Sequence, residues 1–559
     1  MNAIKVPSIF LPVILAFAPV SAHAQATNAA QCDALAASPL DTSRPTGVPG
    51  VAAEKIDATL AEATCQRAVE EQPSARLYFQ LGRALEMGHK YLAAVTNYRL
   101  SAEQNFAPGQ NNLGRMYLRG QGVNQDDTEA AFWYRKAAEQ GYAASETNLG
   151  WMYETGNGVA TDDAQAIAWY RKAADAGYAE GETSLATMYL NGRGALKDDG
   201  QAIAWFHKAA DQGDVDSQYY LGWMYANGRG TTKDDVQAVA WYRKAAEKGS
   251  AAGQNALANA YEDGAGVTTD DAQAAFWYRK AAEQSNADSQ SELGWMYANG
   301  TGVTKDDAQA LYWLRKAADQ GHAGGQNNLA YMYAEGRGVA RDYAQSVSLY
   351  RKASEQGNAT AQYNLGLAYR DGEGVAKDAV QAASWLRKAA DQDLAAAQAE
   401  LGAMYSLGHG VTQSDAQAAA WTLKAAMQGN PTGQRNLGWA YENGRGLRRD
   451  IAQAKNWYGK AAAQGDVKAK AALQHIQLAN SEPQQPGRAP SRQSAAPPAS
   501  PNGEHGPPNL NRYTTSQQNG MVMGAGLALL CSLVTNPAYG LSAEETQRRY
   551  DACMKNATK

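Results

Sequence analysis

Hydrophobic and polar positions repeat along most of this chain with one fixed period. A leucine at Leu113 recurs every 36 residues as far as Leu437, and Leu473 begins a shortened copy. In each copy Leu, a Gly or Ala, and Tyr at i, i+1 and i+4 share one helical arc, which predicts a short first helix. A fixed period of this length predicts a stacked solenoid of supersecondary units.

A second helix is expected in each unit, because signals mark its start. Two glycines, Gly120 and Gly122 in the first unit, end the first helix in a tight loop. Asp126 and its equivalents then precede the second helix in nine units, and Ser414 takes this place in the remaining unit. Glu129, or a Gln in the other units, stands three residues later. This spacing predicts a capping box in every unit.

The unit reads "GQxxLGxMYxxGxGVxxDDAQAxxWYRKAAEQG" and resembles the Sel1-like repeat, a relative of the tetratricopeptide repeat. The resemblance covers about 108–478. It implies an all-α, right-handed α/α superhelical solenoid whose first helices line the concave face. Such proteins act as scaffolds or adaptors, and bacterial members are often exported. Residues 77–104 resemble one tetratricopeptide unit without the Gly-rich loop, which we expect to cap the array.

The first residues are typical of an export signal. Lys5 precedes an apolar stretch over 6–20, and "AHA" at 22–24 is a small-x-small cleavage pattern. We expect a mature chain from Gln25 in the periplasm; the alternative is an uncleaved N-terminal anchor. The expected organisation is a signal peptide (1–24), a loop and helix (25–73), a tetratricopeptide-like cap (74–107), ten Sel1-like repeats (108–465), a capping helix (466–480), a Pro-rich disordered linker (481–520) and a small helical module (521–559).

Four cysteines bear on both ends of the chain. An exported protein can form disulfides, and four cysteines allow three pairings. Proximity in the chain favours Cys32–Cys65 and Cys531–Cys553, one bridge near each end; free thiols are the alternative if the chain is not exported. We expect loop over 32–51 and helix over 52–71.

Near the C-terminus, the apolar stretch 521–534 is short for a membrane span. A small folded module is favoured over an anchor or a docking peptide.

Composition and motifs give no case for catalysis. The formal net charge is −5 without long runs of one sign, so nucleic-acid binding is not expected. We find no phosphate-binding loop, no metal-type spacing of His or Cys and no pairing of a nucleophile with a base. The Asp126–Asp127 pair and its equivalents suggest acid–base dyads or calcium ligands, but helix capping accounts for them. We expect no enzyme activity, no cofactor and no metal.

All 13 tryptophans lie in the repeats, in two columns. One column, in the second helix, is Trp in nine units and Leu349 in the remaining unit, which predicts core packing. The other, two residues after the repeat Leu, also accepts Arg, Thr, Asn, Leu and Ala, as a surface position does. An Asn three residues earlier could bond an extended backbone while the ring covers apolar side chains. The alternative is that these rings fill space between neighbouring first helices.

We therefore predict an exported α-solenoid that binds a protein or extended peptide along its concave face, with no membrane span in the mature chain. The partner-binding candidates are Asn112, Arg115, Asn148, Trp151, Trp223, Trp295, Asn328, Tyr331, Asn364, Asn436 and Trp439. The alternative is a peptidoglycan- or β-lactam-binding protein or hydrolase, as the resemblance to a cysteine-rich branch of Sel1-like proteins would imply. That branch has paired Cys in its repeats, whereas this array has none between 66 and 530.

Overall fold

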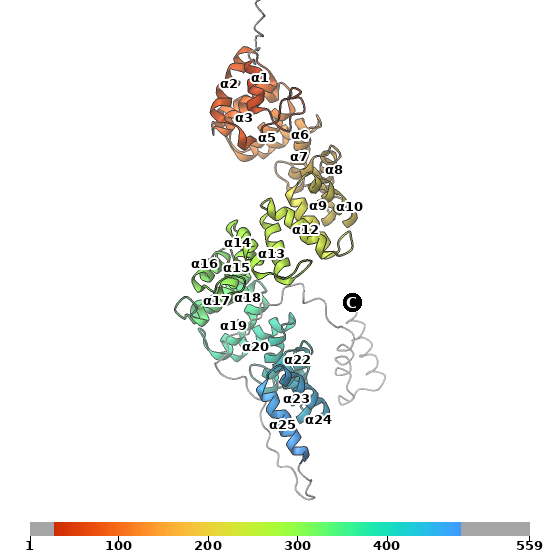
Figure 1. Ribbon diagram of the computed structural model, residues 1–559, viewed down its shortest axis with the longest axis vertical. Coiled ribbons are helices and arrows are strands. Elements are labelled where there is room, and N and C mark those ends of the chain that lie inside the picture. Colours follow the sequence, from red (N-terminus) through yellow and green to blue (C-terminus); the bar gives the residue numbers. More distant parts are fainter. Residues whose placement is uncertain (1–26, 482–559) are drawn as a thin grey trace, which may run out of the picture. The chain divides into compact units, whose positions relative to one another are not determined.

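The computed structural model describes residues 27–481, and in this range every regular element is a helix (Figure 1). The predicted signal peptide, most of the linker, the C-terminal module and the Cys531–Cys553 bridge lie outside the described residues. The chain divides into two compact units between Trp241 and Tyr242, within α12, and each unit is an α/α solenoid. The predicted all-α solenoid fold is thereby confirmed.

Ten helix pairs make up the repeats. The first helices are α5 (Ala107–Arg119), α7 (Ala143–Thr155), α9 (Ala179–Asn191), α11 (Val215–Asn227), α13 (Ala251–Asp263), α15 (Ala287–Asn299), α17 (Ala323–Glu335), α19 (Ala359–Asp371), α21 (Ala395–Leu407) and α23 (Pro431–Asn443). The second helices are α6 (Asp127–Ala138), α8 (Asp163–Asp175), α10 (Asp199–Asp211), α12 (Asp235–Glu247), α14 (Asp271–Glu283), α16 (Asp307–Asp319), α18 (Tyr343–Glu355), α20 (Ala379–Asp391), α22 (Asp415–Met427) and α24 (Ile451–Ala463).

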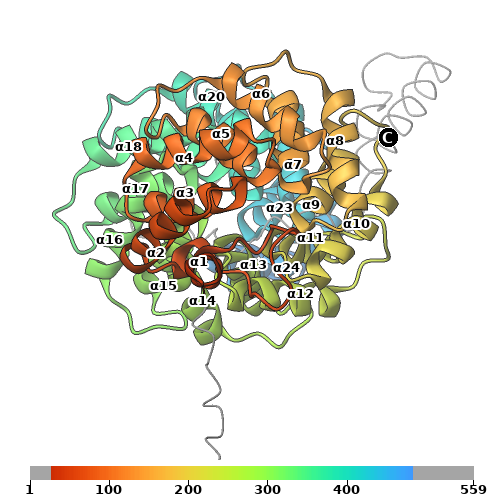
Figure 2. The ribbon, with the colours of Figure 1, turned by 90° about the horizontal axis from the view of Figure 1, so that it is seen from above.

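The first helices line the inner side of each unit. In unit 1, α5, α7 and α9 lie inside the curve and α6, α8 and α10 outside it (Figure 2). In unit 2, α13, α15 and α17 lie inside and α14, α16 and α18 outside (Figure 2). The face that the first helices turn to the inside is called the inner face below.

Glycine ends every first helix, as the sequence predicts. Gly156, which ends α7, has φ +81°, a left-handed conformation that favours glycine. The second glycine of the loop has an additional role between repeats. A Cβ atom on Gly158 would lie 2.0 Å from the Asp127 carbonyl oxygen at the start of the preceding α6. The second glycine therefore allows the loop of one repeat to approach the helix of the repeat before it.

The predicted capping box is half right. The Asp162 carboxylate accepts the Gln165 backbone N–H at 3.0 Å, and equivalent side-chain caps begin the other second helices. The backbone N–H of Asp162 does not bond the Gln165 side chain, however. It donates to the Tyr153 carbonyl in the last turn of α7 at 2.9 Å, and the same bond recurs in all ten repeats. The first helix therefore supplies the acceptor that a capping-box Gln would otherwise provide.

The second Asp of the Asp-Asp pair joins neighbouring repeats. Asp163 forms an ion pair with Arg193 of the next loop, with 2.6 Å between Oδ1 and Nη2. The pairs Asp199–Arg229, Asp307–Arg337 and Asp415–Arg445 repeat this contact. These carboxylates therefore have structural partners, which removes the main reason to consider them as acid–base dyads.

The core contains a residue column that sequence reasoning missed. The residue after each second-helix Trp is an aromatic or Leu side chain in every repeat but the one with Thr422; Tyr170, for example, is fully buried. Its ring lies so close to Gly150 that an added Cβ there would be 2.7 Å from Cε1. The small residue after the repeat Leu makes room for this ring. The Trp column is less deeply placed: Trp241, Trp313 and Trp421 are buried, and the other six are half-buried.

The N-terminal segment differs from the prediction in one respect. Residues 32–51 were expected to be loop, but α1 (Asn28–Ala36) includes Cys32. Thr27 caps this Ala-rich helix, which ends before Pro39, so local capping and composition both favour it. The expected helix over 52–71 is a 3₁₀ turn (Ala53–Lys55) followed by α2 (Ala58–Glu71).

The predicted Cys32–Cys65 disulfide is present and joins α1 to α2. Both helices pack on α3 (Ala75–Met87), which pairs with α4 (Tyr91–Glu103) ahead of the first repeat. Arg83 on α3 donates to the carbonyls of Ala36 and Val51, both at 2.7 Å. At the other end of the described chain, α25 (Val467–Ser481) covers α24. Among the described helices, none is both long and apolar enough to cross a membrane.

Candidate partner-binding surface

The positions two residues after the repeat Leu lie along the inner face of each unit, and the ten of them together are called the inner column here. None of them belongs to the buried core: Trp151 and Asn259 are exposed, and the others are half-buried. The Leu two residues before each position and the Met or Ala directly after it are buried in every repeat. The inner column consists of Arg115, Trp151, Thr187, Trp223, Asn259, Trp295, Tyr331, Leu367, Ala403 and Trp439.

The four inner-column tryptophans differ in how much of the ring already contacts other residues of the protein. Trp151 keeps 39% of its surface exposed. Trp295 packs edge-on against Tyr331 of the next repeat, with 5.7 Å between ring centroids, as the space-filling alternative expected. Trp223 and Trp439 each lie beside an Arg of their own loop, at 5.4 and 6.0 Å. Packing therefore accounts for part of this column, and Trp151 and Trp223 are the better candidates for contact with a partner.

Two asparagines of the candidate site each bond an asparagine of the preceding repeat. Asn148 donates to the Asn111 side-chain oxygen at 3.0 Å, and Asn364 donates to the Asn327 oxygen at 3.1 Å. Asn111 also donates to Asn112 at 3.2 Å. Asn328 accepts from Asn327 and is buried, and Asn436 is half-buried with a buried side-chain oxygen that has no partner in the structure. The bonds of Asn148 and Asn364 join neighbouring first helices, so these two amides have a structural role.

Arg115 is tied to the capping repeat. Its guanidinium forms an ion pair with buried Glu86 on α3 at 2.6 Å, and the Tyr98 hydroxyl donates to the same carboxylate at 2.7 Å. Burial and the Glu86 charge raise the pKa of Tyr98. The three side chains form a network that fastens α3 and α4 to the first repeat, so Arg115 has a structural role.

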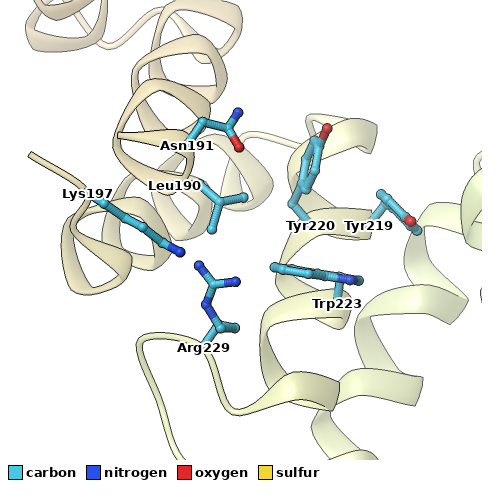
Figure 3. A pocket seen from close by; sticks show the side chains of 7 residues that line it. All are labelled: Leu190, Asn191, Lys197, Tyr219, Tyr220, Trp223 and Arg229. Carbon is cyan, nitrogen blue, oxygen red and sulfur yellow. The ribbon is translucent and has the colours of Figure 1, made fainter. Parts of the chain in front are cut away.

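A pocket of about 380 Å³ opens in unit 1 beside the inner column. It lies between the ends of α9 and α11 and the loops that follow them (Figure 3). Its lining residues are Leu190, Asn191, Lys197, Tyr219, Tyr220, Trp223 and Arg229. Only Trp223 is among the residues predicted from sequence. The sequence feature that could have indicated this pocket is the Tyr219–Tyr220 pair, because other repeats mostly carry small or polar residues at these two positions.

In unit 2 the inner face carries acidic residues. Burial, together with the nearby carboxylates of Glu262 and Asp288, raises the pKa of Glu292 to about 8. Asp288 itself is paired with His322 at 2.8 Å, which lowers its pKa. Within residues 27–481, no group of His, Cys, Asp and Glu side chains has the arrangement of a metal site.

Stacked helix pairs with a variable inner column define this protein as a helical-repeat solenoid. A model of the Sel1 repeat matches ten consecutive segments, from 107–142 to 431–466, so the chain belongs to the Sel1 repeat family. The resemblance stated from the sequence is confirmed. The fold is typical of proteins that act through protein–protein interactions.

Two solved structures illustrate the similarity. The Escherichia coli protein c5321, described as a protective antigen of uropathogenic strains with an SLR fold, is 38% identical, with a TM-score of 0.63. The alignment covers 75% of this chain and 90% of that one. A Sel1 repeat protein from Oxalobacter formigenes is 33% identical over 43% of this chain and 96% of its own, with a TM-score of 0.41. Among curated proteins no match was found.

Proposed function

We propose that this protein is an extracytoplasmic scaffold that binds a protein partner as an extended segment along the inner face, in signalling or in the assembly of an envelope complex. The observation that carries the proposal is the inner column: ten equivalent positions, none buried, with large aromatic side chains at five of them. Half-exposed Trp and Tyr provide contact area with little conformational entropy to lose, which suits a binding surface.

The polar neighbours of these rings support binding of an extended chain. Asn148 lies one helical turn before Trp151, so an amide and a ring lie side by side on α7. The Asn148 side-chain oxygen can accept a backbone N–H while its amide N–H remains bonded to Asn111. The export signal predicted from the sequence and the Cys32–Cys65 disulfide support a location outside the cytoplasm.

The test is a quantitative crosslinking pull-down with a matched control. The inner variant is Trp151→Ala with Trp223→Ala. The outer variant, Phe132→Ala with Phe276→Ala, removes two aromatic rings from second helices, where they are 45% and 50% exposed. Both variants are first compared with the native chain by circular dichroism and melting.

The proposal predicts that a partner captured by the native chain is lost with the inner variant and retained with the outer variant. Equal loss from both folded variants would mean that binding does not depend on the inner face. Retention by both would also contradict the proposal.

A further inference from the structure

The pocket in unit 1 combines aromatic walls with two cationic groups. Figure 3 shows the ends of Lys197 and Arg229 pointing toward the same space below Leu190, with the Trp223 ring beside the guanidinium. The Trp223 ring is 5.4 Å from the guanidinium carbon. The two cations come from different loops, Lys197 from the loop after α9 and Arg229 from the loop after α11. The tertiary structure therefore brings together charges that belong to the loops of two successive repeats.

The charge inside this pocket is only partly compensated. Arg229 donates to both Asp199 carboxylate oxygens, at 2.5 and 2.6 Å, so this pair is locally neutral. Lys197 is exposed and its charge also acts on Asp199, but it forms no hydrogen bond or ion pair with any described residue. Two cations against one carboxylate leave one net positive charge at the pocket rim. A rim of this kind favours an anionic group, and the Arg229 guanidinium keeps further N–H donors for it.

The walls above the cations suit an apolar side chain. Tyr220 is held by stacking on the buried Phe206 ring, with 4.9 Å between centroids and 16° between planes. The Trp223 ring lies one turn further along α11, so the two rings and Leu190 enclose an apolar space. Asn191 adds an exposed amide at the edge. An aromatic wall held by core packing is preorganised, which lowers the entropy lost on binding.

We infer that this pocket binds a pair of adjacent residues in an extended partner segment, one aromatic or large aliphatic and the other Asp or Glu. The apolar side chain enters between Tyr220 and Trp223, and the carboxylate meets Lys197. The inference rests on the proposed function, because it assigns one recognition element to the same inner face. An internal acidic residue is favoured over a chain terminus, because Trp151 lies two repeats earlier on the same unit and a bound segment can continue toward it.

The test uses a phage-displayed library of random 12-residue peptides, selected on the full native chain and on Lys197→Gln. This substitution is at an exposed side chain, so the fold should be unaffected. We expect the native chain to enrich peptides that contain an aromatic or large aliphatic residue next to Asp or Glu. The Lys197→Gln variant should not enrich the acidic residue. An enriched peptide is then synthesised with its C-terminus free or amidated, and with the acidic residue changed to its amide.

Affinities are measured by fluorescence anisotropy. Loss of either the Lys197 charge or the peptide carboxylate should weaken binding about fivefold, and losing both should weaken it no further, because one contact is removed in each case. Enrichment of peptides without acidic residues, additive effects or a requirement for a free C-terminus would each overturn the inference and leave the proposed function standing. Failure to enrich any peptide would count against both.

Discussion

Replacing Glu146 by Gln should stabilise unit 1 at neutral pH. Most repeats have a buried Gln at this position in the first helix. Gln110 is an example: its amide donates to the Ala102 carbonyl of the preceding helix at 3.2 Å, and its oxygen accepts from Gln140 at 2.6 Å. Glu146 is 5% exposed, but its Oε2 atom is buried without a partner. An ionised carboxylate cannot donate to a carbonyl, so the contact made by Gln is lost.

The absence of a hydrogen-bond donor to the Glu146 carboxylate has a simple cause. The residue 30 positions after Glu146, equivalent to Gln140, is Ala176, which has no donor side chain. A buried polar group without a partner lowers stability by about 1–3 kcal/mol. Glu146→Gln removes the buried charge and restores an amide that can bond the preceding helix, while the side-chain oxygen still lacks a donor, so we expect a gain of about 1 kcal/mol. For a unit of this size, each kcal/mol raises the melting temperature by about 2–4 °C.

The gain should depend on pH in a defined direction. Burial raises the pKa of Glu146 above its unfolded value of about 4.3. The folded state therefore binds the proton more tightly, and native stability falls as pH rises through the interval between the two pKa values. Nearby Lys172 opposes this shift but is the smaller influence. The Glu146→Gln advantage should be full at pH 7.5 and much smaller at pH 4, where the native carboxyl is protonated.

The assay is urea unfolding followed by circular dichroism at both pH values, with Glu182→Gln as the control. Glu182 is 3% exposed and occupies the same position in the next repeat, but it already accepts the Gln212 amide at 2.7 Å. Its replacement should therefore gain less. A neutral or destabilising Glu146→Gln, or a gain that is equal at both pH values, would refute this reasoning.

Three further predictions concern stability. Reducing the N-terminal disulfide, which spans 33 residues, should destabilise α1 and α2 by about 3–4 kcal/mol, measured as earlier proteolysis of this segment in dithiothreitol. Gly158→Ala should lower the melting temperature much more than Gly141→Ala, because only the first places a Cβ against backbone although both glycines have positive φ. Asp162→Ala should cost about 1 kcal/mol in urea unfolding, whereas Gln165→Ala should cost almost nothing, since the Gln side chain does not complete a capping box; equal losses would restore the capping-box interpretation.

The sequence alone determined the repeat, its two helices and their ends. These features are local: an Asp cap, a glycine with positive φ and a helical arc each act within a few residues, and the fixed period repeats them ten times. The Cys32–Cys65 pairing also followed from proximity in the chain. Local rules went wrong where another element supplied the partner. The Tyr153 carbonyl bonds the Asp162 N–H, and no pattern within the second helix reveals it.

The tertiary structure decided which surface residues already make contacts within the protein. Equivalent positions in the sequence have different roles: Trp295 packs on Tyr331, and Arg115 pairs with Glu86, while Trp151 remains exposed. The pocket that brings Lys197 to Trp223 likewise depends on how one repeat stacks on the next. The contacts that distinguish these positions, such as Trp295–Tyr331 and Asp163–Arg193, join residues 30 or more positions apart, so their partners are set by packing, which the period of the sequence does not specify.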